Sequence, residues 1–220
     1  MLAKFVDAVI DPVRMDQAVA AVEHELIPEF LEHDGALHGY WSAEMGSGHV
    51  LALTVWRDAD ALLASAAAHG AARATVGERI GLRLCSVTTL PVLATSRVSD
   101  RAADRAHPEW IRVTWVDGVT PAMRDGLPQL YRSTVADQSA SAGFCGSYWL
   151  GDERSPEACA VSLWDGTADL VAGSGASRRR RRRLARALGF GIKSVHEYRT
   201  FAVIHAAPER AGVAAEVATV

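Results

Sequence analysis

The stretch HGYW at residues 38–41 has a counterpart, GSYW, at residues 146–149. Each Tyr-Trp pair precedes an apolar run that ends in another Trp, at residues 49–56 in the first case and at residues 158–164 in the second. A single shift of 108 residues aligns both Tyr-Trp pairs and both later Trp residues, without gaps from residue 35 to about residue 94. Matches of this kind at one offset are rare by chance, so the pattern predicts an internal duplication.

Both copies predict the same order of elements. An apolar run opens each copy, an amphipathic helical pattern follows, and two strand-like runs, a second helix and a last strand complete it. In the first copy the elements before and after the second helix are expected at residues 4–10, 15–30, 36–44, 49–56 and 83–94, with Asp58 capping that helix. In the second copy they are expected at residues 111–116, 123–135, 143–150, 158–164 and 192–205, with Asp165 as the cap. The order β-α-β-β-α-β is the ferredoxin-like pattern.

This order of elements also predicts how the two copies combine. A four-stranded sheet with both helices on one face leaves its other face bare, and two such units can cover that face by pairing their sheets. We therefore expect an α+β fold in which two tandem ferredoxin-like (βαββαβ) repeats pair their antiparallel sheets into one α+β barrel within a single chain. The expected boundaries are residues 1–95 for the first repeat, 96–109 for a linker, 110–206 for the second repeat and 207–220 for a flexible tail.

The composition excludes several classes of function. The 220 residues are 49% hydrophobic and 22% charged and carry a net charge of −3, so no overall field draws the molecule to nucleic acid or to an anionic membrane. No apolar run reaches membrane-spanning length. The three cysteines, Cys85, Cys145 and Cys159, form no CxxC pair and are odd in number, which fits free thiols in a reducing compartment. We expect a cytoplasmic protein that binds neither nucleic acid nor membranes.

Six consecutive arginines, Arg178–Arg183, stand in the second copy. A basic patch for nucleic acid, or for an acidic carrier protein that bears the substrate, is one interpretation of this run. The other is a solvated helix segment whose charge is offset by the 26 acidic residues of the chain. The second interpretation is favoured, because nucleic-acid binding needs a wider basic surface with interleaved aromatic residues.

The stretch VWRDADALLASAAAHG at residues 55–70 joins a strand that ends in Trp to an acidic cap and an Ala/Leu helix. It resembles the antibiotic biosynthesis monooxygenase branch of the dimeric α+β barrel superfamily, and the order of elements resembles that superfamily over about 190 residues. The resemblance implies a pocket between a sheet and its helices, and oxidation of a polycyclic aromatic phenol by molecular oxygen, often without metal or flavin. The fused arrangement departs from the usual one-domain subunit, which leaves open whether one or both repeats hold an active pocket.

The first hairpin predicts which side chains share a face. A turn centred on Ser47 places His38 opposite Trp56 and Tyr40 opposite Thr54, and opposed residues point to the same face. The face expected to line a small-molecule site holds His38, Tyr40, Ser42, Ala52, Thr54 and Trp56. The apolar face expected inside the barrel holds Leu37, Trp41, Leu51, Leu53 and Val55. The site face of the second copy is expected to hold Gly146, Tyr148, Leu150, Ala160, Ser162 and Trp164.

Within this face, His38 is the candidate catalytic base, since the pKa of imidazole lies near neutrality, and Tyr40 is its candidate catalytic partner. The candidate substrate-binding residues are Trp56, Thr54, Ser42, Tyr148, Trp164 and His196. Core packing is the stronger interpretation for the two Trp residues. For His38, the role of a catalytic base and that of a hydrogen-bonded imidazole on a half-buried strand are evenly balanced. Four other histidines are expected at the surface or in loops: His24, His33, His49 and His69.

No Rossmann or P-loop glycine pattern and no HxxxH pair is present, so we expect no metal site and no cofactor, with molecular oxygen as co-substrate. The predicted function is that of a metal- and flavin-independent monooxygenase acting on an aromatic polyketide-type phenol or anthrone in secondary metabolism. Haem binding or degradation through His38, His69 or His196 is one alternative. A polyketide cyclase or isomerase, or a non-catalytic binder of small molecules, is another. A homodimer and an acidic carrier protein are the partners left open besides the small aromatic substrate.

Overall fold

A computed structural model gives the structure of the chain. It describes residues 1–97, 108–120, 123, 131–132, 134–136, 138–139, 143–152, 155–167, 170, 178–179, 182–183, 185–186 and 189–205. The core of the expected linker, the expected tail and much of both expected helices of the second repeat therefore lie outside the described residues. The expected repeat and linker boundaries stay predictions.

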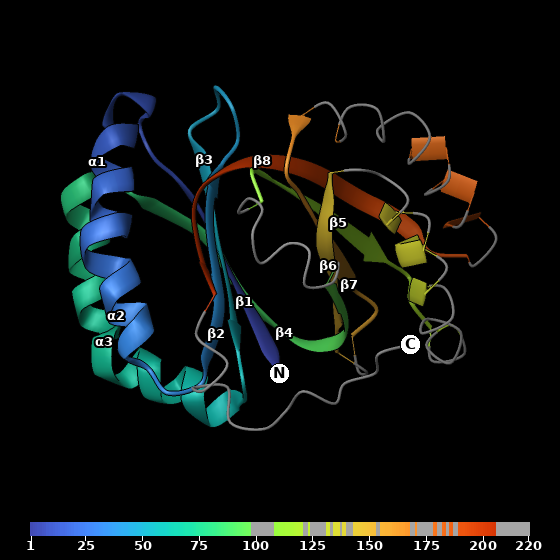
Figure 1. Ribbon diagram of the computed structural model, residues 1–220, viewed down its shortest axis with the longest axis horizontal. Helices are drawn as coiled ribbons and strands as arrows, with labels where there is room; N and C mark the ends of the chain where they lie inside the picture. Colours follow the sequence, from blue (N-terminus) through green and yellow to red (C-terminus); the bar gives the residue numbers. More distant parts are fainter. Residues whose placement is uncertain are drawn as a thin grey trace. The chain divides into compact units, whose positions relative to one another are not determined.

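Eight strands and several helices form the part of the chain that the structure describes (Figure 1). The strands are β1 (Leu2–Val9), β2 (Ala36–Ala43), β3 (His49–Trp56), β4 (Arg83–Arg97), β5 (Trp110–Asp117), β6 (Phe144–Gly151), β7 (Ala158–Trp164) and β8 (Gly191–His205). The helices are α1 (Met15–Ala21), α2 (Ile27–Glu32) and α3 (Ala59–Ile80), with a 3₁₀ turn at Pro12–Arg14 and a π turn at Val22–Leu26. The strands hydrogen-bond in the closed order β1-β3-β2-β8-β5-β7-β6-β4, which confirms the predicted α+β barrel.

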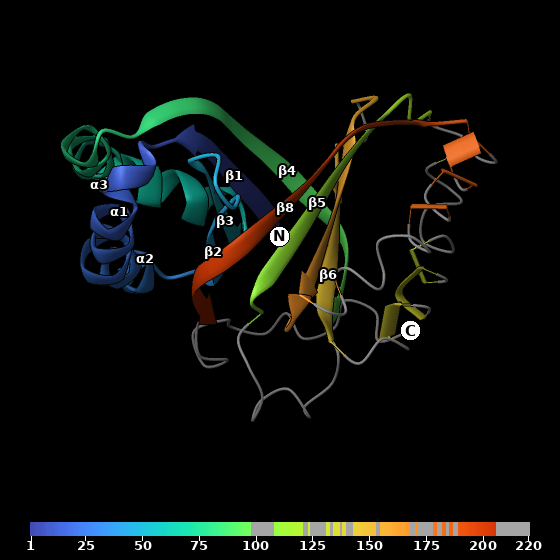
Figure 2. The ribbon, with the colours of Figure 1, turned by 90° about the horizontal axis from the view of Figure 1, so that it is seen from above.

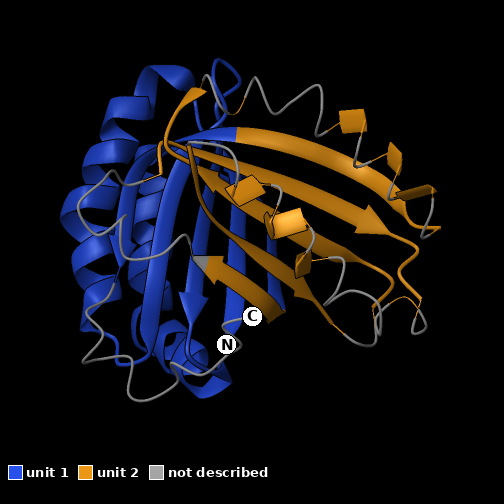
Figure 3. Cartoon of the chain, turned by 45° about the vertical axis from the view of Figure 1, so that its right-hand side comes forward, with its two compact units in different colours: residues 1–90, 198–215 blue, residues 91–197, 216–220 orange. Residues whose placement is uncertain are grey.

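The chain divides into two compact units that cut across the two repeats (Figure 3). Unit 1 comprises residues 1–90 and 198–215, and unit 2 comprises residues 91–197 and 216–220. The long strands β4 and β8 each contribute one half to either unit. In unit 1, β2 pairs with the end of β8, and in unit 2 the end of β4 pairs with β6.

Helix α3 follows from local sequence signals. The Asp58 side chain accepts a hydrogen bond of 2.8 Å from the backbone N–H of Ala61, as the sequence predicts for an N-cap. Gly81 ends the helix in the left-handed conformation, with a φ of 71°, where a residue with a side chain would be strained. The Ala-rich interior between these caps has high helix propensity, which explains a helix of 22 residues.

The first helical region is interrupted before α2. Pro28 stands near the start of α2, and because proline has no N–H it cannot continue the backbone ladder of the preceding helix. The turn before α2 is widened into a π turn at this point. Glu29 follows in the first turn of α2, and His33 caps its C-terminus.

The pairing of β2 with β3 differs from the predicted register by one residue. Trp56 pairs with Ala36, whereas the sequence predicted His38 as its partner, and His38 pairs with Val55. Leu37 is the extra residue of a β-bulge at this point. Because side chains alternate between the faces of a strand, a shift by one residue exchanges the faces of all later partners.

The second copy has the same irregularity. Phe144 pairs with Trp164 and Gly146 pairs with Leu163, so Cys145 is the extra residue. The predicted site face is therefore wrong in both copies. In β2 and β3, one face holds His38, Tyr40, Ser42, Leu51, Leu53 and Val55, and the other holds Gly39, Trp41, Ala52, Thr54 and Trp56.

In unit 1, helices α1 to α3 cover the face of the β1–β3 sheet that carries the two Trp residues (Figures 1 and 2). The ring of Phe30, on α2, meets Trp41 and Trp56 edge-on, with centroids 5.8 and 5.2 Å apart. Trp56 is 2% exposed and donates its indole N–H to Thr54 Oγ1 at 3.0 Å. The interpretation of Trp56 as a core residue is confirmed.

In unit 2, Trp164 has the same indole hydrogen bond as Trp56 and also packs against a Phe ring. Its indole N–H donates to Ser162 Oγ at 3.0 Å, and the ring packs against Phe144 with centroids 5.4 Å apart. Arg112 lies over the Trp164 ring at 5.9 Å and donates to Glu197 and to a backbone carbonyl. The Arg112 side chain is 2% exposed, so these contacts compensate the cost of burying its charge.

Among the described residues, no helix is both long and apolar enough to cross a membrane. Within Arg178–Arg183, the described arginines are helical and exposed, which agrees with the favoured interpretation of a solvated helix segment.

The three cysteines differ in burial, and we therefore expect them to differ in their reactivity toward thiol reagents. Cys85 is exposed, whereas burial raises the pKa of Cys145 to about 11 and raises that of the fully buried Cys159 well above its usual range. At pH 8 a thiol with a pKa near 11 is about 0.1% thiolate, and the thiolate is the reactive form. We expect a thiol reagent to modify only Cys85 rapidly in the native protein, as followed by mass spectrometry. The Cys85→Ser variant should lose the fast phase, and rapid labelling of Cys145 in the native wild type would contradict the structure.

Candidate functional site

The predicted catalytic pair of unit 1 lies on the face of the sheet away from α1 to α3. His38 and His205 approach each other with their Nδ1 atoms 3.0 Å apart, and the ring of Tyr40 lies 5.9 Å from that of His205. Ser42 is on the same face, fully buried, and donates to the carbonyl of Leu51. The structure thus adds His205, which the sequence analysis missed, to His38 and Tyr40.

The other two predicted residues of unit 1 lie on the opposite face. Trp56 and Thr54 hydrogen-bond to each other beneath the helices. The predicted set of His38, Tyr40 and Trp56 therefore does not form one site within unit 1. The β-bulge at Leu37 is the physical reason, because it reverses the faces that the predicted register assigned.

In unit 2 the predicted substrate-binding residues also separate. Tyr148 pairs with Val161 and lies on the face opposite to Trp164, and His196 is half-buried on β8. The hydroxyl of Tyr131 contacts Ser147 twice. It donates a hydrogen bond to the backbone carbonyl of Ser147, and it also hydrogen-bonds with the side-chain hydroxyl of Ser147. Burial raises the pKa of Tyr131, so this hydroxyl is a donor at neutral pH.

Unit 1 contains a cluster of ionisable side chains between its helices and its sheet. Glu29, on α2, accepts two hydrogen bonds from the guanidinium of Arg73, on α3, one of them 2.8 Å from Nε to Oε2. Arg73 Nη2 also lies 2.5 Å from the hydroxyl of the fully buried Ser65. The Glu29 side chain is 11% exposed and that of Arg73 is 27% exposed. A bidentate pair in this setting holds the carboxylate and the guanidinium in one geometry.

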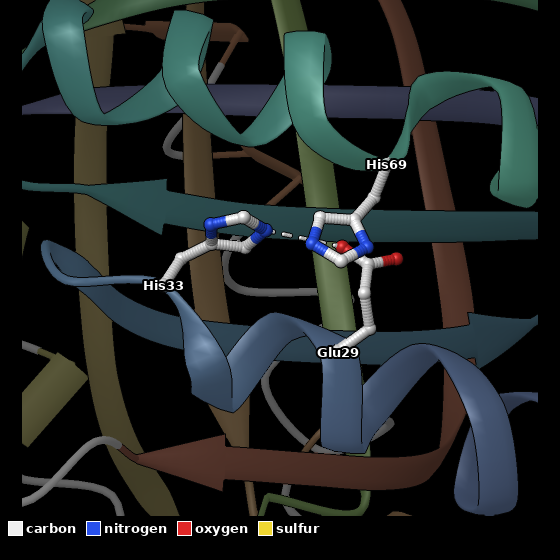
Figure 4. A group of neighbouring side chains, drawn as sticks. All are labelled: Glu29, His33 and His69. Carbon is white, nitrogen blue, oxygen red and sulfur yellow. Dashed lines mark hydrogen bonds and ion pairs between the residues drawn. The ribbon is translucent and has the colours of Figure 1, made fainter.

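Two histidines complete the cluster (Figure 4). His33 Nε2 lies 3.3 Å from Glu29 Oε1, and the His33 side chain is 12% exposed. The His33 ring lies 6.0 Å from Trp56 and 4.8 Å from the ring of half-buried His69, on α3. Both histidines were expected at the surface or in loops. His33 does lie in the loop after α2, although its side chain is largely buried, whereas the expectation is wrong for His69, which is half-buried within α3. We call Glu29, His33, Ser65, His69 and Arg73 the helix-side cluster.

Lys4 lies at the sheet side of the helix-side cluster. It pairs with Thr54 across β1 and β3, so its side chain is on the face that the helices cover. Burial lowers the pKa of Lys4, and the positive charge of Arg73 lowers it further, while Glu29 raises it. The site thus combines two cations and one carboxylate with two imidazoles.

A sequence signal for this cluster exists. Ser65, His69 and Arg73 recur every four residues in an Ala-rich helix, which places them on one helix face. Glu29 and His33 have the same spacing. The sequence does not reveal that these two faces meet, because residues 29 and 73 are brought together only by the packing of α2 and α3 on one sheet.

Protein-family models and curated proteins give no match to this chain. Solved structures do match it. An anthrone oxidase-like protein is 17% identical, with 93% of each chain covered and a TM-score of 0.62. An uncharacterised ferredoxin-fold protein related to antibiotic biosynthesis monooxygenases, from Listeria monocytogenes 4b F2365, is 8% identical, with 90% of this chain and 94% of that chain covered and a TM-score of 0.52.

A haem-binding protein from Thermus thermophilus is 9% identical, with 90% of each chain covered and a TM-score of 0.57. At these identities the likeness concerns the fold. The chain has the fold of ferredoxin-fold proteins related to antibiotic biosynthesis monooxygenases.

Proposed function

We propose that the chain is a monooxygenase-like enzyme that oxidises an aromatic phenol or anthrone with molecular oxygen, and that the helix-side cluster of unit 1 is its active site. The observation that carries the proposal is the His33–Glu29–Arg73 arrangement. A half-buried imidazole is oriented by a carboxylate, and that carboxylate is itself fixed by a guanidinium. The shared fold with an anthrone oxidase-like protein supports the class of substrate.

Oxidation of a phenol or an anthrone by oxygen requires a base and a source of positive charge in the protein. A base takes a proton from the phenol or the anthrone, and positive charge stabilises the resulting anion, which is the form that gives electrons to oxygen. His33 is the proposed base, and Lys4 and Arg73 supply the positive charge. For an anthrone, one oxygen atom becomes the new carbonyl oxygen of the quinone, and the other leaves as water with the two hydrogens of the oxidised carbon.

Trp56 has a supporting role in this proposal. It lies beneath His33 and is 2% exposed, so it fixes the position of the imidazole by packing. Trp164 stands at the equivalent position of the second copy and contacts Phe144 and the buried Arg112, so packing is the part of this role that the two Trp residues share.

Substitution of the two candidate bases tests the location of the active site. With a hydroxylated anthrone under air, we expect His33→Gln to lower the rate of quinone formation by roughly 100-fold or more, because general-base catalysis contributes about 10²–10⁴-fold. His38→Gln, on the other face of the same sheet, is the matched control and should retain the wild-type rate.

The reverse result, with activity lost in His38→Gln and kept in His33→Gln, would move the site to the pair of residues first predicted from the sequence. Quinone formation by the wild type that does not exceed the spontaneous background, in a folded preparation that consumes no oxygen, would overturn the proposed activity itself.

The lowered pKa of Lys4 predicts a pH dependence. A lysine that helps to hold the substrate anion loses its charge as the pH rises through its pKa, and in the folded protein this occurs below the ordinary value of 10.5. We therefore expect kcat/KM to fall on the alkaline side at a pH below 10.5. Lys4→Arg, which stays protonated, should remove this fall, whereas an identical alkaline limb in both proteins would exclude a role for the Lys4 charge.

Haem binding is the second candidate function, and the shared fold with a haem-binding protein favours it. Of the three predicted ligands, His38 lies beside His205, His69 lies in the helix-side cluster and His196 is half-buried in unit 2. A Soret shift on titration with haem that disappears in His69→Ala would support this function. The cytoplasmic location, a homodimer and an acidic carrier protein stay predictions.

A further inference from the structure

We propose that Glu29, His33 and His69 form a binding site for a first-row divalent metal ion such as Zn²⁺. One carboxylate oxygen of Glu29 and one ring nitrogen of each histidine all lie within 4.8 Å of one another. Figure 4 shows these three side chains pointing toward one another, Glu29 from α2, His33 from the position directly after α2 and His69 from α3. The sequence predicted no metal site because it contains no HxxxH pair. Spacing along the chain does not reveal ligands that come from distant segments, such as His33 and His69.

The distances are close to those that a metal ion needs. Ligands bound tetrahedrally at 2.0–2.1 Å lie about 3.4 Å from one another. His33 Nε2 and Glu29 Oε1 are already 3.3 Å apart. His69 is the group that must approach, by at most roughly 1.4 Å, and a half-buried side chain near a glycine on α3 can do this by rotation about its side-chain bonds.

The donor set selects the class of metal. Two imidazoles and one carboxylate suit zinc, iron, cobalt, nickel and copper, whereas calcium and magnesium prefer a site made only of oxygen ligands. Three protein ligands leave at least one coordination position open for water or another small ligand.

One of the two hydrogen bonds from Arg73 to Glu29 can persist with the metal bound. Its Oε1 atom faces His33, while Oε2 accepts the 2.8 Å hydrogen bond from Arg73 Nε. Arg73 Nη2 gives up its contact with Oε1 and keeps its contact with Ser65. Hydrogen bonds of this kind to a ligating carboxylate orient it toward a metal.

The nearby cations set the affinity. The charges of Arg73 and Lys4 oppose a divalent cation, so we expect a dissociation constant in the micromolar range rather than the nanomolar range of dedicated zinc sites. Removal of the Lys4 charge by Lys4→Met should therefore tighten metal binding several-fold. A merely adventitious surface site, remote from Lys4, would not respond to this change.

Metal binding also has a consequence for the proposed activity. This consequence rests on the proposed function, whereas the metal site itself does not. In the metal-free protein His33 Nε2 donates its hydrogen to Glu29, so Nδ1 is the nitrogen that accepts the substrate proton. A metal on Nε2 takes the place of that hydrogen and leaves the neutral imidazole with its one proton on Nδ1, so His33 can no longer act as the base. Zinc should therefore inhibit the oxidation of the anthrone, with a midpoint equal to its dissociation constant.

The test measures binding first. The full-length protein is freed of metals with a chelator and titrated with Zn²⁺ by calorimetry and with Co²⁺ by absorption spectroscopy. We expect one metal ion per chain with a cobalt spectrum of nitrogen and oxygen ligands. His69→Ala should weaken binding at least tenfold, and His49→Ala, which removes an exposed histidine, should leave it unchanged. A thermal melt of each variant shows that it is folded.

Equal zinc affinity in the wild type and in His69→Ala would overturn the proposal, as would the absence of any binding. Neither result would affect the proposed oxidase activity. Zinc that binds through His69 without inhibiting the oxidation would instead support the metal site and show that His33 is not the base.

Discussion

One extra residue in each hairpin decides how side chains are distributed in this protein. The bulge at Leu37 places Trp41, Thr54 and Trp56 on the face of the unit 1 sheet that the helices cover, and it places His38 and Tyr40 on the other face. Without the bulge, the alternation of side chains would mix these two groups. The core around Trp56, and the polar groups that lie over it, both depend on this local change in register.

The helix-side cluster illustrates how ionisable groups are kept beneath helices. Burial of Glu29 and Arg73 costs free energy that each group alone could not recover, and their bidentate pair together with the Ser65 hydroxyl compensates for it. Such a pair is rigid, and rigidity is what a site needs in order to hold His33 at a fixed position. The interaction that makes this burial tolerable is therefore also the one that shapes the proposed site.

The two copies have diverged at equivalent positions. Lys4 pairs with Thr54 in the first copy, and Arg112 pairs with Ser162 in the second, 108 residues later in each case. Arg112 is neutralised by Glu197 and lies over Trp164, a closed structural arrangement. Lys4 instead interacts electrostatically with Glu29 and Arg73. The helix-side cluster also holds the imidazoles of His33 and His69, which the second copy does not show among its described residues.

The sequence by itself predicted the duplication, the positions of the strands, the N-cap of α3 at Asp58 and the α+β barrel, because these follow from local periodicity and from one repeated offset. It also identified Trp56 and Trp164 as core residues. Only the tertiary structure decided the faces of the hairpins, since a bulge at Leu37 leaves no mark in the pattern of apolar residues. Only the packing of α2 and α3 on one sheet brought Glu29 to Arg73, because contacts between distant segments are set by the fold and not by spacing along the chain.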